Sequence, residues 1–276
     1  MKTVLIIAFT VAFVVIVITI AILFSDNWKF DESVLDIITE QKSEIILPPP
    51  GTSDLFYWKF DGSGFVLNPH LGELYNEISV NDEIQKTVVV IPVFTDSAYF
   101  EPGFYTYYKG ECDSSCLTTE IQPEHFLEFH SSGYAVDVLR LLGYQTITDI
   151  DIDKNPDILS DYDKVIMLHN EYVTRNEFNA VTNHPHVMYL YPNALYAEII
   201  TNYENNTITL IRGHGYPEKG ISNGFDWKFD NTHPFEFDTD CNQWEFYEID
   251  NGVMLNCYPE NTIPRDEFLL RAIKDY

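Results

Sequence analysis

Residues 4–24 form one long apolar stretch near the start of the chain and contain no charged side chain. Because an α-helix rises about 1.5 Å per residue, a helix over this stretch reaches roughly 30 Å, the thickness of a bilayer's hydrocarbon core. Its only polar side chains, Thr10 and Thr19, can hydrogen-bond to the backbone of their own helix. The sequence therefore predicts a transmembrane anchor in residues 1–25.

A cleaved signal peptide is the alternative to an anchor. The apolar region of such a peptide is typically about 7–15 residues long and ends at a site of small residues. The stretch here is longer, and the chain leaves it through Phe24, Ser25 and Asp26, which is a poor cleavage site. We expect an uncleaved signal-anchor, although cleavage after Ser25 stays open.

The charges that flank the apolar stretch predict its orientation. Lys2 precedes the stretch, and the acids Asp26, Asp31, Glu32 and Asp36 follow it. By the positive-inside rule, the N-terminus lies in the cytoplasm and the chain from residue 26 onward lies outside it. We expect a single-pass cell-membrane protein with an extracytoplasmic domain.

Cysteine usage agrees with an oxidising compartment. The chain has four cysteines, at Cys112, Cys116, Cys241 and Cys257. Three pairings are possible, and we favour Cys112–Cys116, which closes a small loop, and Cys241–Cys257, which staples a hairpin near the C-terminus. A four-thiolate zinc site is the weaker alternative because no C-x-x-C spacing is present. Asn205 begins an N-glycosylation sequon in a polar turn.

The charge balance excludes some classes of partner. The formal net charge is −27, with 43 acids against 16 bases. A surface this negative repels phosphate backbones, so we expect no nucleic-acid partner. The acids either keep the protein soluble in a salty exterior or bind cations.

The chain after the anchor divides into a linker and one large domain. Residues 26–53 are acidic and reach a stiff break at Pro48, Pro49, Pro50 and Gly51. The domain, residues 54–276, begins with an aromatic lead-in and ends in a turn-rich tail. β-Branched or alternating runs predict strands at residues 87–94, 145–152, 164–168, 186–191 and 207–212. Helical spacing and cap residues predict helices at residues 132–142, 174–183, 194–200 and 265–274.

The alternation of these strands and helices is typical of an α/β fold. It predicts a doubly wound, mostly parallel, flavodoxin-like sheet with helices on both faces. The tail from Gly213 is aromatic and holds a cysteine pair, so we expect a β- and loop-rich C-terminal extension there.

Residues 161–198 resemble the core of class I glutamine-amidotransferase-like domains. They are similar to the C-terminal part of the large subunit of N,N-dimethylformamidase, in which a Tyr-Asp pair leads into a strand that ends in a His-x-Glu-Tyr motif. The matching residues here are Tyr162, Asp163, His169, Glu171, Tyr172, Thr174 and Asn193. The resemblance implies a catalytic elbow at residues 192–196, but no cysteine stands there. Glutaminase chemistry is therefore not expected.

The candidate site residues follow the predicted strands. In a doubly wound sheet, ligands bind beyond the carboxyl ends of the strands. His169, Glu171 and His214 are the candidate catalytic residues, because imidazoles and a carboxylate act as acid–base groups or hold a metal. The candidate ligand-binding residues are Asn170, Asn193, Tyr196 and Arg212. The competing interpretation is that these polar side chains only cap helices or bond to loop backbone.

Asp149, Asp151 and Asp153 form an acidic run that is a second, weaker metal candidate. Alternation along a strand would place all three carboxylates on one face, and calcium takes several carboxylate ligands. The run lacks the glycine and terminal glutamate of an EF-hand loop, so a solvated acidic edge is the alternative.

Two functions remain open from the sequence. The first is a membrane-tethered, non-catalytic domain that binds an envelope protein, a glycan or a small ligand and needs no cofactor. The alternative is an envelope amide or glycan hydrolase that uses His169, Glu171 and His214, with assistance from a divalent cation such as calcium or zinc. A hydrolase requires these three side chains to converge in one pocket with perturbed pKa values, whereas a binding module allows them to be dispersed.

Overall fold

The computed structural model describes residues 54–59, 64–80, 85–122, 127–229 and 234–276. The described residues belong to one compact unit. The predicted anchor in residues 1–25 and the predicted linker at 26–53 lie outside the described residues. None of the described helices is long and apolar enough to cross a membrane.

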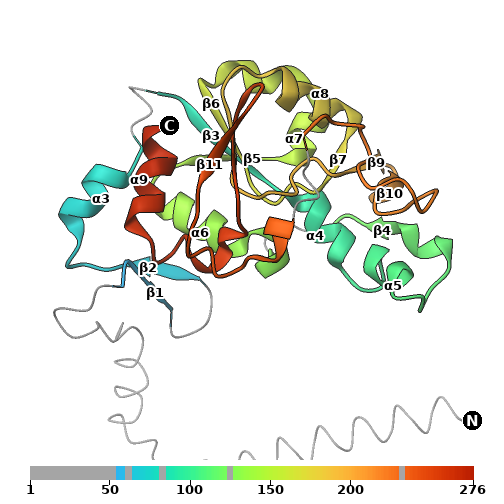
Figure 1. Cartoon of the computed structure of the whole chain (residues 1–276), viewed down its shortest axis with the longest axis horizontal. Helices are drawn as coiled ribbons and strands as arrows, with labels where there is room; N and C mark the ends of the chain where they lie inside the picture. Colours follow the sequence, from blue (N-terminus) through green and yellow to red (C-terminus); the bar gives the residue numbers. More distant parts are fainter. Residues whose placement is uncertain (1–53, 60–63, 81–84, 123–126, 230–233) are drawn as a thin grey trace, which may run out of the picture. The chain divides into compact units, whose positions relative to one another are not determined.

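A six-stranded sheet forms the centre of the domain (Figure 1). From one edge to the other its strands are β5 (Gln145–Thr148), β3 (Thr87–Ile91), β6 (Lys164–Met167), β8 (Val187–Tyr189), β12 (Gly252–Leu255) and β11 (Phe246–Ile249). The first five are parallel and β11 is antiparallel to β12. Counted along the chain, the parallel strands lie in the order 2-1-3-4-5, which is that of flavodoxin-like doubly wound sheets.

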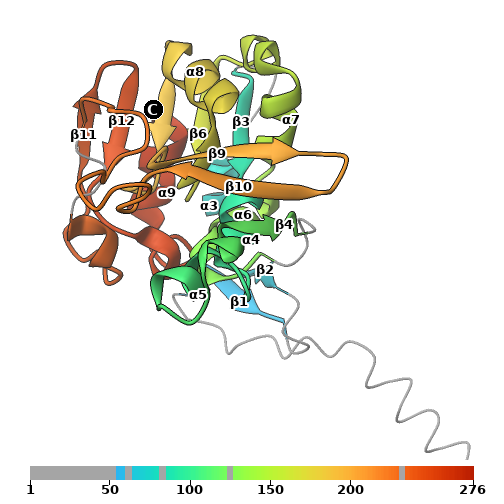
Figure 2. The same cartoon turned by 90° about the vertical axis from the view of Figure 1, so that its right-hand side faces the viewer.

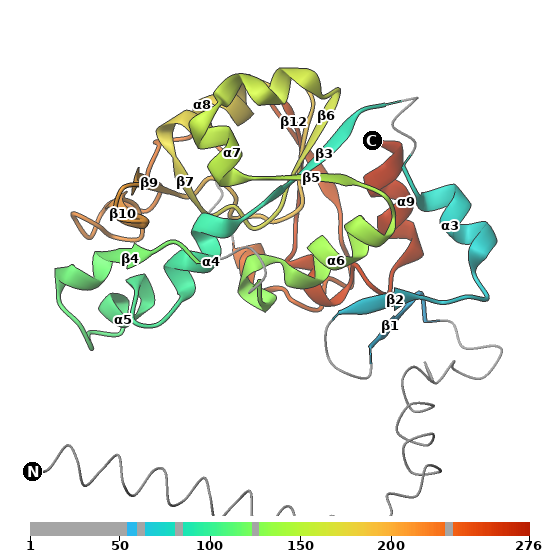
Figure 3. The same ribbon diagram turned by 180° about the vertical axis from the view of Figure 1, so that it is seen from behind.

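Both faces of this sheet are covered, as its apolar strands require. Along β3, Val89 and Ile91 face one core cluster while Val88 and Val90 face the other. The first cluster is covered by α3 (Gly72–Ile78), α6 (Gly133–Leu141) and α9 (Glu267–Asp275). The second is covered by α7 (Asp149–Lys154), η4 (Pro156–Asp161) and α8 (Arg175–Asn183). Figure 3 shows α7 and α8 on the side of the sheet opposite α6.

A second, four-stranded sheet was not anticipated (Figure 2). Its order is β4 (Thr118–Glu120), β10 (Thr207–Arg212), β9 (Ala197–Asn202) and β7 (Tyr172–Thr174). The predicted helix at residues 194–200 is wrong, because this segment pairs with β10 as β9. The strand predicted at 207–212 exists, but it belongs to this second sheet, and β12 takes its place in the main sheet.

Two predicted strands are shorter than expected because a helix begins at once. The first strand ends at Ile91, and α4 (Val93–Tyr99) follows it directly. The second ends at Thr148, whose hydroxyl accepts a hydrogen bond from the backbone of Asp151 and so begins α7. The acidic run therefore lies on a helix, and the predicted strand alternation at residues 149–153 is wrong.

Helices α6, α8 and α9 confirm the helices that were predicted at residues 132–142, 174–183 and 265–274. The Thr174 hydroxyl accepts a hydrogen bond from the Glu177 backbone at the start of α8, as the cap signal predicted. The lead-in forms a hairpin of β1 (Phe56–Trp58) and β2 (Phe65–Leu67). The remaining elements are short: α5 (Phe104–Tyr108), η1 (Ser114–Leu117), η3 (Phe129–Ser131), η5 (Pro234–Phe237) and η6 (Pro259–Asn261).

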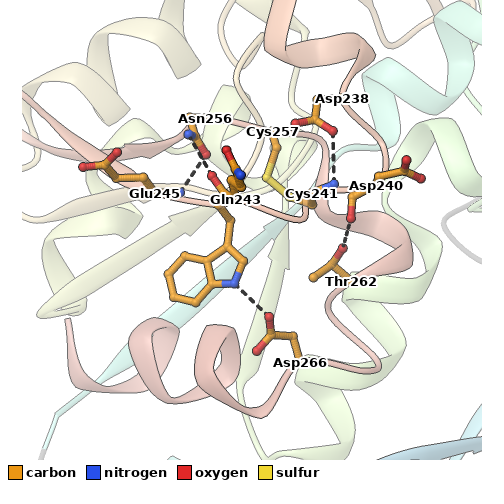
Figure 4. Close-up of a disulfide and its surroundings, with 10 residues drawn as sticks. Asp238, Asp240, Cys241, Gln243, Glu245, Asn256, Cys257, Thr262 and Asp266 are labelled. Atoms are coloured by element: carbon orange, nitrogen blue, oxygen red, sulfur yellow. Dashed lines mark hydrogen bonds between the residues drawn. A yellow bond between two sulfur atoms is a disulfide. The ribbon is translucent and has the colours of Figure 1, made fainter.

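Both predicted disulfides are present. Cys112–Cys116 closes a small loop and has its second cysteine within η1. Cys241–Cys257 joins the two segments that flank the β11–β12 hairpin, and a hydrogen bond from the Cys241 backbone to Asp238 lies beside it (Figure 4). This second bridge ties the C-terminal extension together close to the carboxyl ends of the parallel strands.

Candidate functional site

His169, Glu171 and His214 converge on one point of the fold. His169 and Glu171 follow β6, and His214 lies in the turn after β10, where it adopts a positive φ of 50°. Nε2 of His169 is 3.5 Å from Oε2 of Glu171, and Nε2 of His214 donates to Oε1 of the same carboxylate at 2.5 Å. Two imidazoles, one after a strand of each sheet, thus flank the buried carboxylate of Glu171.

His169 is held so that one ring nitrogen faces Glu171 without a hydrogen-bond partner in the described part of the chain. The ring is buried, and its Nδ1 lies 2.5 Å from the carbonyl oxygen of His130. Because a carbonyl only accepts, Nδ1 carries the proton and donates it. Burial lowers the pKa of His169, and the charge of Glu171 offsets this only in part. The neutral ring therefore leaves a lone pair on Nε2, for which no hydrogen-bond partner is found among the described residues.

Glu171 is a buried carboxylate that stays ionised. Burial raises its pKa, but interactions with His214, His169 and Tyr99 outweigh burial and hold the pKa below its usual value. The Tyr99 hydroxyl donates to Oε2 at 3.0 Å. Burial and the charge of Glu171 raise the pKa of Tyr99, so the phenol keeps its proton at neutral pH.

A cavity of about 390 Å³ opens onto these groups. Its wall is rich in aromatic rings and contains two carboxyl groups. The lining residues are Tyr99, Tyr105, Phe129, His130, His169, Glu171, Asn193, His214, Glu236, Phe237, Thr239 and Tyr258. The side-chain oxygen of Asn193 is a second buried acceptor without a hydrogen-bond partner in the described part of the chain. The cavity thus offers unpaired acceptors to a ligand.

The parallel sheet explains why the cavity lies here. The chain leaves β3 toward β5 on one side and later returns to β6 on the other, so the carboxyl ends of β3 and β6 form the topological switch point. The helix after β3, α4, supplies Tyr99, and the Thr95 hydroxyl of α4 accepts a hydrogen bond from the Glu171 backbone at 2.9 Å. The site is therefore anchored by the main sheet.

The four predicted ligand-binding residues have different surroundings. Asn193 lines the cavity. Asn170 is buried and accepts a hydrogen bond from the Leu168 backbone, which is a structural role. Arg212 donates to the Gly224 carbonyl and to Asp226 and does not line the cavity. Tyr196 packs edge-on against the His214 ring, with centroids 4.4 Å apart.

The three aspartates of the acidic run do not point to a common centre. Asp149 accepts a hydrogen bond from the Phe94 backbone, Asp151 caps α7 through Thr148, and Asp153 accepts one from Tyr203. Across the described residues, no three His, Cys, Asp or Glu side chains are placed to hold a metal ion. The calcium prediction for this run therefore has no geometric support.

Asn205 lies exposed in the turn that joins β9 to β10, as its sequon predicted for an accessible loop. Its backbone N–H donates to the side chain of Asn202, which orders the turn. The turn is far along the hairpin from the strand ends that carry Glu171, so its accessibility has no bearing on the cavity.

Sequence reasoning did not identify several residues that build the cavity. Tyr99 lies at the end of α4, a helix that the sequence did not predict, since the strand predicted here ends at residue 94. His130 stacks on the Tyr99 ring, with centroids 4.6 Å apart, and its carbonyl orients His169. Glu236 and Tyr258 come from the tail, whose folding against the sheet has no local sequence signal.

No protein-family model matches the chain. No curated protein matches it either. The resemblance to glutamine-amidotransferase-like domains therefore stays a prediction, and the functional argument depends on the geometry of the site.

Proposed function

We propose that the cavity is the active site of a metal-assisted hydrolase that cleaves an amide bond. The observation that carries this proposal is the bare Nε2 of His169, fully buried and 3.5 Å from an ionised carboxylate oxygen. An imidazole that donates its other N–H to a backbone carbonyl is the usual arrangement of a metal ligand. The convergence of His169, Glu171 and His214 is also what the catalytic alternative required.

The residues that fit a metal ion are Tyr99, His169 and Glu171. The Tyr99 hydroxyl and Nε2 of His169 lie 3.0 and 3.5 Å from Oε2 of Glu171. His214 does not fit, because its Nε2 donates a hydrogen bond to Glu171 and so has no free lone pair. Tyr99 would complete the set by giving up the proton that it now donates to Glu171, because metal ligands bind in their deprotonated form. An imidazole nitrogen favours zinc or another first-row transition metal over calcium.

A bound ion would supply Lewis acidity toward a carbonyl oxygen and a water molecule. The protein's own residues prepare the site for it. His130 fixes the tautomer of His169, and His214 keeps Glu171 ionised and in place. The unpaired oxygen of Asn193 can accept the N–H of an amide substrate. No cysteine or serine is among the described residues that line the cavity, and no contact in the described part of the chain joins the lining Thr239 to a base, so water is the attacking group in this proposal.

Two features of the chain support an envelope role. Two disulfides are expected of a domain that folds in an oxidising compartment. The apolar stretch at residues 4–24 supplies the anchor in this proposal. The substrate would then be an amide outside the cytoplasm.

Metal analysis of the purified protein tests the proposal. We expect about one equivalent of a transition metal in the wild type and its loss in His169→Ala and Glu171→Gln. His70→Ala is the matched control, because His70 is exposed and does not line the cavity. Hydrolysis of aryl amides should be lost in the same two variants. A wild type that neither retains nor takes up metal would leave non-catalytic ligand binding as the better account.

A further inference from the structure

The tail reaches the cavity on two segments, one on each side of the β11–β12 hairpin. Thr239 lies two residues before Cys241, Tyr258 directly follows Cys257, and Thr239 and Tyr258 both line the cavity. The Cys241–Cys257 bridge joins the two segments, and the backbone N–H of Tyr258 donates to the Asp238 carbonyl at 2.9 Å. Each cysteine is 1% exposed. The bridge therefore closes this part of the cavity wall inside the fold (Figure 4).

Tyr258 is the residue through which this part of the wall contacts His169. Its hydroxyl donates to the Phe129 carbonyl at 2.9 Å, and its oxygen lies 3.2 Å from Nδ1 of His169. Because the phenol gives its single proton to Phe129, its oxygen faces the Nδ1–H of His169 as an acceptor. The His130 carbonyl is the other acceptor at this nitrogen. Two acceptors, one of them from the tail, thus favour the proton on Nδ1.

The packing of the His169 ring depends on the same tail segment. The Tyr258 ring lies edge-on to His169, with centroids 5.1 Å apart, and edge-on to Tyr191, with centroids 4.8 Å apart. Tyr191 lies nearly parallel to the His169 ring at 5.6 Å. The Tyr191 hydroxyl donates to Glu260, which is two residues beyond Tyr258. The segment that begins at Cys257 therefore supports His169 directly and through Tyr191.

The other disulfide has no such connection to the cavity. Cys112 and Cys116 are 4 residues apart in the chain, whereas Cys241 and Cys257 are 16 apart. Neither Cys112 nor Cys116 lines the cavity. Removal of this small bridge is thus a matched control, because it deletes one disulfide and leaves the contacts of Tyr258 in place.

We propose that the Cys241–Cys257 bridge completes the site by holding Tyr258 as the positioning residue of His169, so that His169 keeps one tautomer only in the oxidised protein. As control of the proposed active site, this inference rests on the proposed function, but it concerns the ring alone and involves no metal. The bridge forms when a disulfide oxidant takes two electrons and two protons from the two thiols and is itself reduced to two thiols. The site is thus complete only where such an oxidant has acted.

The tautomer of His169 is the direct measure of this control. We suggest ¹⁵N NMR of the histidine rings in the full-length chain after treatment with a chelator, so that no metal contributes. The wild type should show the Nδ1–H tautomer alone. The double variant Cys241→Ala, Cys257→Ala should show exchange between both tautomers, because an imidazole released from its acceptors has no fixed proton position.

Two further variants separate the bridge from its effect. Tyr258→Phe keeps the bridge and the ring but removes the acceptor, so it should move the balance of tautomers part of the way. The double variant Cys112→Ala, Cys116→Ala should match the wild type. His184 is the internal reference, because its ring is buried outside the cavity and bonds to the Tyr162 carbonyl at 3.0 Å.

The inference is overturned if His169 keeps the Nδ1–H tautomer without the Cys241–Cys257 bridge while His184 is unchanged. Loss of the native His184 signals in the same variant would overturn it too, because the bridge would then serve the whole fold and not the site. Metal analysis of untreated samples separates this inference from the proposed function. A metal-free wild type with a bridge-dependent tautomer refutes only the metal-assisted reaction, and a metal-loaded wild type with a bridge-independent tautomer refutes only the control by the bridge.

Discussion

Two buried glutamates on either side of β7 show how partners, and not burial, decide the state of an acid. Glu171 and Glu177 are both fully buried. His214 and Tyr99 hydrogen-bond to Glu171, and its pKa lies below its usual value. Burial raises the pKa of Glu177 well above its usual value, the charges of Asp149 and Asp153 raise it further, and neither of its carboxyl oxygens has a hydrogen-bond partner among the described residues. Of the two, only Glu171 is an anion that can bind a ligand or a proton donor.

The position of each acid in the fold accounts for this difference. Glu171 lies at the carboxyl ends of the parallel strands, where loops from several elements bring imidazoles and phenols together. Glu177 lies in the first turn of α8, packed against α7. Its neighbours are other acids, so the protonated, neutral carboxyl group has the lower free energy there. A carboxyl group is thus ionised at the candidate site and neutral in the core between α7 and α8.

Removing the carboxylate of Glu171 should have the largest effect on stability. In Glu171→Leu, His214 and Tyr99 lose their acceptor inside the protein. Breaking a buried pair from one side typically costs about 3–5 kcal/mol of the free energy of unfolding. Urea denaturation at pH 7 measures this cost. A loss below about 1 kcal/mol would mean that the carboxylate is not paired as described.

A third buried acid gives an intermediate effect that depends on pH. Burial raises the pKa of Glu260 to about 8, against hydrogen bonds from Tyr191 and the Tyr134 backbone that lower it. A carboxyl whose folded pKa is raised gives stability that is complete below the unfolded pKa and is lost as pH rises through the folded pKa.

The useful window for this measurement is pH 6.5 to 8. Burial lowers the pKa values of His169 and His130, so these residues make stability rise with pH only below about pH 6.5. Burial lowers the pKa of Lys164 to about 8, so its opposing effect begins above about pH 8. Glu260 by itself should lower the free energy of unfolding by about 2 kcal/mol across this window. Glu177 and Glu236, whose pKa values are also raised, add to the fall. Glu260→Gln should reduce the fall. An increase in wild-type stability over the same range would contradict the neutral Glu260.

Neutralising Glu177 should have the smallest effect. Because the side chain is already uncharged in the fold, Glu177→Gln removes little charge interaction and should change the free energy of unfolding by less than about 1 kcal/mol. The same denaturation experiment at pH 7 measures it beside Glu171→Leu. A cost as large as that of the Glu171 variant would show that Glu177 is ionised and paired.

The sequence predicts the main sheet and its helices better than the second sheet. The valine-rich run of β3 and the strand of β6 are apolar on both faces, and the Thr174 cap precedes a clear helical pattern, so these elements were identified. The segment at β9 was mistaken for a helix because a short apolar run with little alternation has no distinct period. Its strand state depends on pairing with β10, which is a tertiary contact.

The candidate site was predictable to the extent that it follows the strand ends. His169 and Glu171 come directly after β6, so the parallel-sheet rule placed them at the ligand-binding edge. His214 was found by the same reasoning, although its strand belongs to the second sheet. Tyr99, His130 and Tyr258 could not be found this way. They reach the cavity through packing of α4, η3 and the tail, which no local pattern encodes.

The central claim is that His169 presents a free lone pair to the cavity, and ¹⁵N NMR of the histidine side chains tests it most directly. At pH 7 we predict a neutral ring with its proton on Nδ1, and a large change at Nε2 when zinc is added. The Glu171→Gln variant should lose the response to zinc. A ring protonated on both nitrogens, or a proton on Nε2, would contradict the account, because no lone pair would then face the ligand.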